Sequence, residues 1–223
     1  MQFLRYLYIP ILLSFACLGW MSAGPYCLLF FSEIGIHVSL ISVILNTIAT
    51  SHQVSNPEKV SGYKFFIWRT AVIAYEVNMV FNFMITLIFW TVLWWHPTEW
   101  SWIDYYMAII HIVPFSVPCQ EFVIQRWSFR YNHFVVILML ATSYLALSYY
   151  WAKTHWPIYA FLSWEDIGTW IFAFIVLFFG YLSFVVFYWI AKLKQKQQKT
   201  KVIQGFMINN QQALVPVEFV YQV

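Results

Sequence analysis

One pair of residues in this chain has the chemistry of a hydrolytic site. Ser32 lies in FFSEIGIH (30–37), and His111 lies in AIIHIVPFSVPCQEF (108–122). A serine hydroxyl is a weak nucleophile until a base removes its proton, and a neutral imidazole is a suitable base. Together the two residue types predict acyl transfer, in which the hydroxyl attacks an ester carbonyl. The prediction depends on whether the fold brings them to one place.

Two further residues beside Ser32 are candidates for a supporting role. Glu33 follows Ser32 directly but points about 100° away around a helix, so we expect it to orient a partner. His37 lies more than a turn beyond Ser32 on the opposite face, where it would contact another helix. Neither is expected to serve the Ser32 hydroxyl directly.

A second set of polar residues lies further from this pair and is expected to be structural, with a proton or ion pathway as the alternative. Polar side chains join helices inside bilayers, and we expect Arg69, Arg126 or hydroxyl groups as partners of the two glutamates. The set comprises Glu76, Asn78, Asn82 and Glu121, with Thr86 extending the asparagine stripe at helical spacing.

The elements that must position these residues are membrane-spanning helices. The chain has 223 residues, of which 62% are hydrophobic and 9% charged, whereas a soluble domain carries roughly a quarter charged residues. A helix needs about 20 apolar residues to cross a bilayer. Six stretches meet that length: 3–21, 26–49, 66–95, 105–123, 133–152 and 168–191. The sequence therefore predicts an all-α polytopic membrane protein, a bundle of six transmembrane helices over 1–191, followed by a basic and apolar C-terminal tail over 192–223.

The basic residues predict how the bundle is oriented. If both termini lie on one side, eleven of the twelve Lys and Arg residues fall on that side, and only Lys153 falls on the other. This is the positive-inside pattern, so we expect both termini on the cytoplasmic side, or on the matrix side of an organelle inner membrane. Which membrane holds the protein does not follow from the charges.

Orientation brings Ser32 and His111 to one depth. The second and fourth spans enter from the same side near Pro25 and Asp104, and each candidate residue lies seven residues further on, about 10 Å below that surface. Pro114 and Pro118 remove amide donors from the fourth span, leaving the carbonyls of Ile110 and Pro114 in need of other partners. The prolines therefore favour a polar pocket beside His111, although a kinked helix is also a common structural device.

Other classes of site and partner are disfavoured. The cysteines (Cys17, Cys27, Cys119) lack zinc-like or disulfide spacing, and the histidines and acids lack ligand spacing on any one helix, so no metal and no cofactor are expected. A net charge of +3 is too small to indicate nucleic acid. The expected partners are the lipid bilayer, a lipid substrate and other subunits of a membrane complex.

Four segments resemble the androgen-induced protein family of six-span membrane proteins, and more distantly the Rolling stone-like proteins. They are FFSEIGIH (30–37), IFWTVLWWHPTEW (88–100), IIHIVPF (109–115) and PIYAFLSW (157–164). The resemblance implies an atypical threonine hydrolase of lipid esters, such as fatty-acid esters of hydroxy fatty acids. It places the family's histidine at His111 and its threonine at Ser32. Serine keeps the nucleophilic hydroxyl but lacks the methyl group that restricts its rotamer.

The sequence leaves three functions open. The first is an intramembrane lipid ester hydrolase with Ser32 as nucleophile and His111 as base. The second is a non-catalytic accessory or scaffold subunit of a larger membrane complex, which the aromatic spans and apolar tail would suit. The third is a small transporter, which would show inverted halves with broken helices, and no such internal repeat is visible.

Overall fold

The computed structural model describes residues 2–51, 62–94, 101–124 and 129–213, and every regular element in these ranges is helical. Six helices in these ranges are long and apolar enough to cross a membrane, which confirms the prediction of an all-α, multi-pass chain. Of the charged residues used to orient the chain, Lys59 and Arg126 lie outside the described residues.

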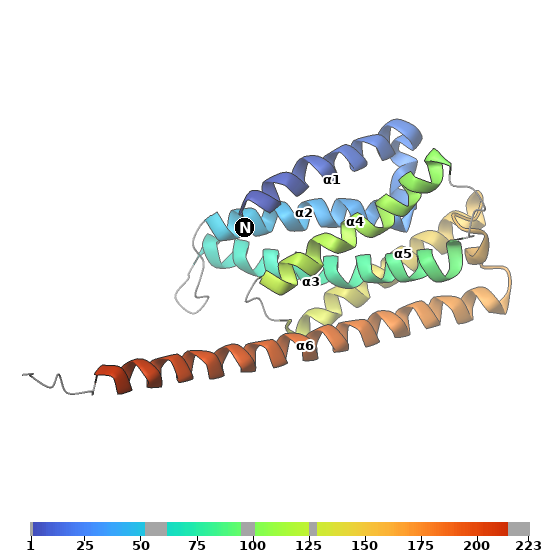
Figure 1. The fold of residues 1–223 in the computed structure, drawn as a ribbon. Helices are drawn as coiled ribbons and strands as arrows, with labels where there is room; N and C mark the ends of the chain where they lie inside the picture. Colours follow the sequence, from blue (N-terminus) through green and yellow to red (C-terminus); the bar gives the residue numbers. More distant parts are fainter. Residues whose placement is uncertain (1, 52–61, 95–100, 125–128, 214–223) are drawn as a thin grey trace, which may run out of the picture.

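The helices are numbered in chain order (Figure 1). They are α1 (Gln2–Ala23), α2 (Phe31–Ser51), α3 (Tyr63–Ile88), α4 (Trp102–Ile124), α5 (Phe134–Thr154) and α6 (Ile167–Ala213). Short 3₁₀ turns η1 (Gly24–Leu29), η4 (Tyr131–His133) and η5 (Ala160–Leu162) lead into α2, α5 and α6, and a π-helical turn, η3 (Phe89–Leu93), extends α3.

The third helix is the centre of the bundle. It contacts α2, α4, α5 and α6, and 67% of its most apolar window is buried, against 39% or less in every other candidate span. Gly35 of α2 lies against it so closely that a Cβ atom added there would stand 2.8 Å from Asn82 Oδ1. The absence of a side chain at Gly35 therefore sets the spacing between α2 and α3.

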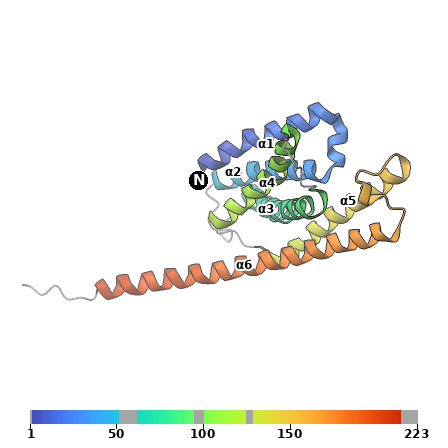
Figure 2. The same cartoon turned by 45° about the vertical axis from the view of Figure 1, so that its right-hand side comes forward.

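The last two helices lie along one side of the other four (Figures 1 and 2). α5 packs loosely, with only Ile137 and Ser148 fully buried among its described residues. α6 has 47 residues, a length of about 70 Å, which is more than twice the hydrocarbon core of a bilayer. It projects beyond the bundle at the end where α1 begins. The basic run that starts at Lys192 is part of the same helix.

Candidate functional site

Ser32 is positioned by the turn that joins α1 to α2. Gly24 has a φ of +56°, a left-handed conformation that glycine adopts without strain, and Pro25 begins the 3₁₀ turn that follows. α2 then starts at Phe31, whose backbone N–H donates a hydrogen bond to Tyr159 Oη at 3.0 Å. Ser32 thus occupies the first turn of α2, and a tyrosine from the α5–α6 connection fixes the preceding residue.

His111 is held in one orientation by contacts on three sides. Its Nδ1 lies 2.7 Å from Met107 O, and its ring stacks on Phe89 at a centroid distance of 3.7 Å and an angle of 9°. Thr86 donates a hydrogen bond to the His111 carbonyl at 2.6 Å. Because a carbonyl only accepts, Nδ1 carries the proton, and Nε2 of the neutral ring keeps its lone pair as an acceptor. The π-helical turn at the end of α3 supplies the stacking phenylalanine.

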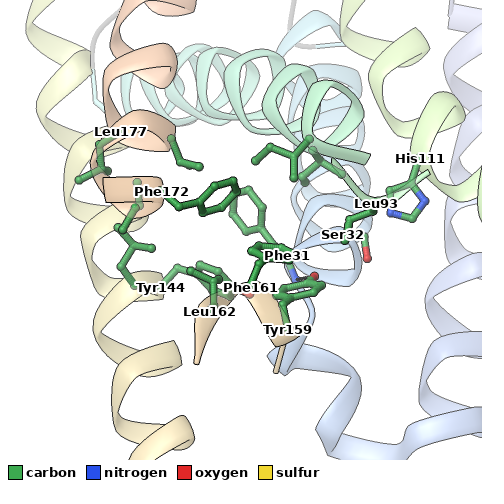
Figure 3. A pocket seen from close by; sticks show the side chains of 16 residues that line it. Phe31, Ser32, Leu93, His111, Tyr144, Tyr159, Phe161, Leu162, Phe172 and Leu177 are labelled. Atoms are coloured by element: carbon green, nitrogen blue, oxygen red, sulfur yellow. Dashed lines mark hydrogen bonds between the residues drawn. The ribbon is translucent and has the colours of Figure 1, made fainter. Parts of the chain in front are cut away.

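Ser32 and His111 line the same pocket. It lies between α2, α3, α4, α5 and α6 and contains about 630 Å³ of space free of protein atoms, part of it open to the outside. Figure 3 shows Ser32 and His111 at one end of the pocket, with Tyr144, Phe172 and Leu177 at the other. Nearly every other lining side chain is apolar or aromatic. The pocket therefore combines a hydroxyl, an imidazole and a hydrophobic cavity.

No hydrogen bond joins Ser32 Oγ to the His111 ring among those recorded for the described residues. The Ser32 hydroxyl instead lies within reach of the Tyr159 hydroxyl and influences the pKa of that phenol. Burial raises the pKa of Tyr159, and hydrogen-bonding groups of Phe31, Tyr144 and Ser32 oppose this rise. Three polar groups, from α2, α4 and the α5–α6 connection, therefore meet at one end of the pocket.

Tyr159 is not among the site residues that the sequence predicts. Its only signal in the sequence is its place in PIYAFLSW, a segment that carries the family resemblance but no catalytic motif. Its connection is anchored by Trp164, whose Nε1–H donates to Ser148 Oγ of α5 at 3.1 Å. Trp164 is buried and has a φ of +61°, a backbone conformation that a bulky residue adopts only when its surroundings impose it. The anchor explains how a connecting segment can hold a phenol at the pocket.

The two candidate supporting residues face α1 rather than the pocket. Glu33 Oε2 is buried, has no hydrogen-bond partner among the described residues and lies against Gly19, where an added Cβ atom would meet it. The His37 Nδ1–H donates to Glu33 O at 2.7 Å, and Nε2 accepts a hydrogen bond from Trp20 at 3.0 Å. Both ring nitrogens of His37 are therefore used in joining α2 to α1, as expected for a histidine that contacts another helix.

Glu121 pairs with Arg5, a partner that the sequence did not predict. Arg5 Nε and Nη2 lie 2.5 Å and 2.8 Å from the two Glu121 oxygens, and Nη1 reaches Thr50 Oγ1 at 2.6 Å. Arg126, one of the two arginines expected as partners, lies outside the described residues. The pairing was missed because Arg5 and Glu121 are 116 residues apart, and a single sequence contains no signal for that contact.

Glu76 also has other partners than Arg69. It accepts a hydrogen bond from the Arg130 backbone N–H at 3.0 Å and from His133 Nδ1 at 3.1 Å, and its side chain is fully buried. These contacts connect α3 to the turn that begins α5. The structural interpretation of Glu76 fits this geometry, because every contact joins two elements and none faces the pocket.

The asparagine stripe and the prolines form one polar layer between α2, α3 and α4. Ser39 Oγ lies 2.7 Å from Asn78 Oδ1 and 3.2 Å from Pro114 O, and Asn82 Nδ2 donates to Asn78 Oδ1 at 2.6 Å. Pro114 O is the carbonyl that loses its helical donor to Pro118, so the prediction that it needs a side-chain partner is confirmed. This layer lies one helical turn from His111 and joins α2 to both α3 and α4.

No group of three His, Cys, Asp or Glu side chains in the described part of the chain is placed to hold a metal ion. Comparison of the chain with protein-family models, with curated proteins and with solved structures found no match.

Proposed function

We propose that this protein is an intramembrane hydrolase of lipid esters in which Ser32 is the nucleophile and His111 the general base. The observation that carries the proposal is the shared wall of the pocket, where Ser32 and His111 meet an otherwise apolar cavity. Such a cavity suits a substrate with a long hydrocarbon chain and one polar, reactive bond. The resemblance to the androgen-induced protein family points to the same chemistry and the same two residues.

The proposed reaction has two steps. The Ser32 hydroxyl attacks the ester carbonyl while His111 Nε2 takes its proton, and the alcohol leaves with that proton, giving an acyl-serine. Water, deprotonated by the same nitrogen, then attacks the acyl-serine and releases the fatty acid and the free Ser32 hydroxyl. Met107 O holds the Nδ1 proton throughout, and Phe89 keeps the ring in plane.

Tyr159 is positioned to assist by donating its phenolic hydrogen. Its oxygen accepts the Phe31 N–H and its hydroxyl lies beside those of Tyr144 and Ser32, so its O–H would exchange one of these contacts for the carbonyl oxygen as negative charge develops there. The proposed reaction requires a rotation of the Ser32 side chain about its Cα–Cβ bond, which exchanges the Tyr159 contact for one to His111. Serine permits this rotation more readily than threonine, whose second substituent restricts the rotamer.

The first test is covalent labelling. A fluorophosphonate probe should label the purified protein at Ser32, labelling should disappear in Ser32→Ala, and Ser32→Thr, which keeps a hydroxyl, should retain it. His111→Ala should lower ester hydrolysis by about a thousandfold or more, because the hydroxyl loses its base. His37→Ala is the matched control, since that imidazole faces α1. Labelling that persists in Ser32→Ala, or hydrolysis that survives His111→Ala, would remove the catalytic assignment.

A second function, as a non-catalytic subunit of a larger membrane complex, is favoured by the length of α6. The helix continues well beyond the bundle (Figure 1), and a membrane span alone does not require that extension. Gentle solubilisation from a native membrane distinguishes the two functions. Migration with a large assembly together with absence of fluorophosphonate labelling would favour the subunit, whereas labelling of the isolated protein would favour the hydrolase.

A further inference from the structure

A second cavity adjoins the pocket at Ser32 and His111. It contains about 390 Å³ of space free of protein atoms, part of it open to the outside, and lies between α3, α5 and α6. The two cavities share four lining residues: Phe31, Ala141, Val176 and Leu177. The second cavity ends near Gly180 and Tyr181 of α6 and contains almost no polar group. The two hydrophobic cavities are therefore neighbours, and Ser32 and His111 line only the first.

We infer that this second cavity is the binding site for the distal part of a single unbranched acyl chain, and that Gly180 sets how long a chain it admits. The inference rests on the proposed function for the position of the ester, which would lie at Ser32. It adds the direction of the chain, along α6 from Phe172 towards Gly180, and a residue that determines chain length.

The dimensions of the space support an acyl chain. Phe172 and Gly180 are eight residues apart on α6, a separation of about 12 Å along the helix. An extended hydrocarbon advances about 1.25 Å per carbon, so about ten carbons span this distance. A longer chain would leave the cavity between α5 and α6, where few α5 side chains are buried.

Gly180 is the residue that keeps the far end of this space open. A Cβ atom added at Gly180 would have no heavy atom within 4 Å. At Gly35, side chains of the neighbouring helix occupy the space that a Cβ atom would need. At Gly180, no such contact among the described residues explains why the residue is a glycine. The absent side chain at Gly180 adds directly to the cavity, and a large side chain would fill it.

Phe31 lies where the two cavities join. The centroid of its ring lies 5.3 Å from that of Phe81 and 4.8 Å from that of Tyr144. Its backbone N–H donates a hydrogen bond to Tyr159 Oη. The residue next to the proposed nucleophile therefore also borders the path of the chain. A chain passing Phe31 would have its ester carbonyl beside Ser32.

Binding is tested without catalysis, in Ser32→Ala protein reconstituted into liposomes. The probe is hexadecanoic acid with a photoreactive diazirine at carbon 10, and mass spectrometry identifies the labelled peptides. Labelling should fall on the parts of α5 and α6 that line the second cavity. Gly180→Phe should reduce it by about tenfold or more, because the contacts of several methylene groups are lost. Leu182→Phe is the matched control, since Leu182 lies on the same helix and is 43% exposed.

Equal labelling in the Gly180→Phe and unmodified proteins, or labelling spread over exposed residues such as Leu182, would overturn the inference. Ala141→Phe, which fills the junction from α5, replaces Gly180→Phe if that variant does not elute as a single folded species.

A parallel measurement separates this inference from the proposed function. Hydrolysis of acyl esters from four to sixteen carbons is compared in proteins that retain Ser32, where Gly180→Phe should move the preferred chain towards the short end. If Gly180→Phe abolishes labelling but no protein that retains Ser32 hydrolyses any ester, the second cavity binds an acyl chain and the proposed hydrolase function is contradicted. Hydrolysis with an unchanged chain-length profile would support the hydrolase and contradict the role of Gly180.

Discussion

At the scale of single residues, the polar groups of this bundle divide into two kinds. Ser32, His111 and Tyr159 line a cavity that is otherwise almost entirely apolar. Arg5 and Glu121 satisfy each other across a helix interface. Residue type alone does not separate these kinds, because a buried ionisable group in a membrane span is equally consistent with chemistry and with helix association.

The Arg5–Glu121 pair yields a prediction at this scale. Arg5→Leu or Glu121→Leu alone should lower the free energy of unfolding by about 3–5 kcal/mol, because each leaves one charge buried without its partner. The double variant should be less destabilised than either single variant, since no charge remains. Thermal unfolding in detergent measures the stability of the two single variants and of the double variant relative to the unmodified protein. A double variant less stable than both singles would show that the pair itself stabilises the fold strongly.

At the scale of elements, α2 and α3 are held at a distance set by a glycine and a polar layer. Gly35 permits the close approach, and the Ser39–Asn78–Asn82 hydrogen bonds join the helices below it. Ser32 lies one turn before Gly35, so its position depends on this packing. Bulk introduced at Gly35 should therefore affect both stability and the site.

We expect Gly35→Val to destabilise the bundle by about 1–3 kcal/mol, the usual cost of overpacking a well-packed interface. Fluorophosphonate labelling should fall in the same variant because α2 moves relative to α4. Ile41→Phe is the control, since it adds bulk to an exposed position on the same helix. Equal melting temperatures for the two variants would contradict the packing role of Gly35.

The helices of this bundle could be predicted from the sequence, and several of their contacts could not. Apolar length alone located six candidate spans, and the spacing of Pro114 and Pro118 identified a carbonyl that needs a donor. The meeting of Ser32 with His111 at one pocket was expected from their equal depth. The partners of Glu76 and Glu121, and the place of Tyr159, depend on which helices are neighbours, and hydrophobicity does not encode that arrangement.

At the scale of the whole molecule, the fold has a tightly packed part and a loosely packed part. α3 is enclosed by its neighbours, whereas α5 leaves most of its surface exposed and borders both cavities. The loose side is where a lipid could enter from the bilayer. The extension of α6 lies outside both parts (Figure 2).

Removal of residues 198–223 tests what the extension contributes. The shortened chain keeps Lys194, whose Nζ donates to Val123 O at 2.8 Å at the end of α4. If the protein acts as a hydrolase by itself, ester hydrolysis should remain within about twofold of the full chain, since every pocket residue is retained. Loss of hydrolysis with the bundle still folded would assign the extension a direct role.

The Arg5–Glu121 pair also has a consequence for biosynthesis. The two residues are separated by 116 positions, and a ribosome adds roughly 5–20 residues per second, so Arg5 is made several seconds or more before its partner exists. During that interval the guanidinium must remain at the water interface, with its aliphatic stem along α1. The first helix is therefore made before its counter-ion exists, and the ion pair forms only when the fourth helix arrives.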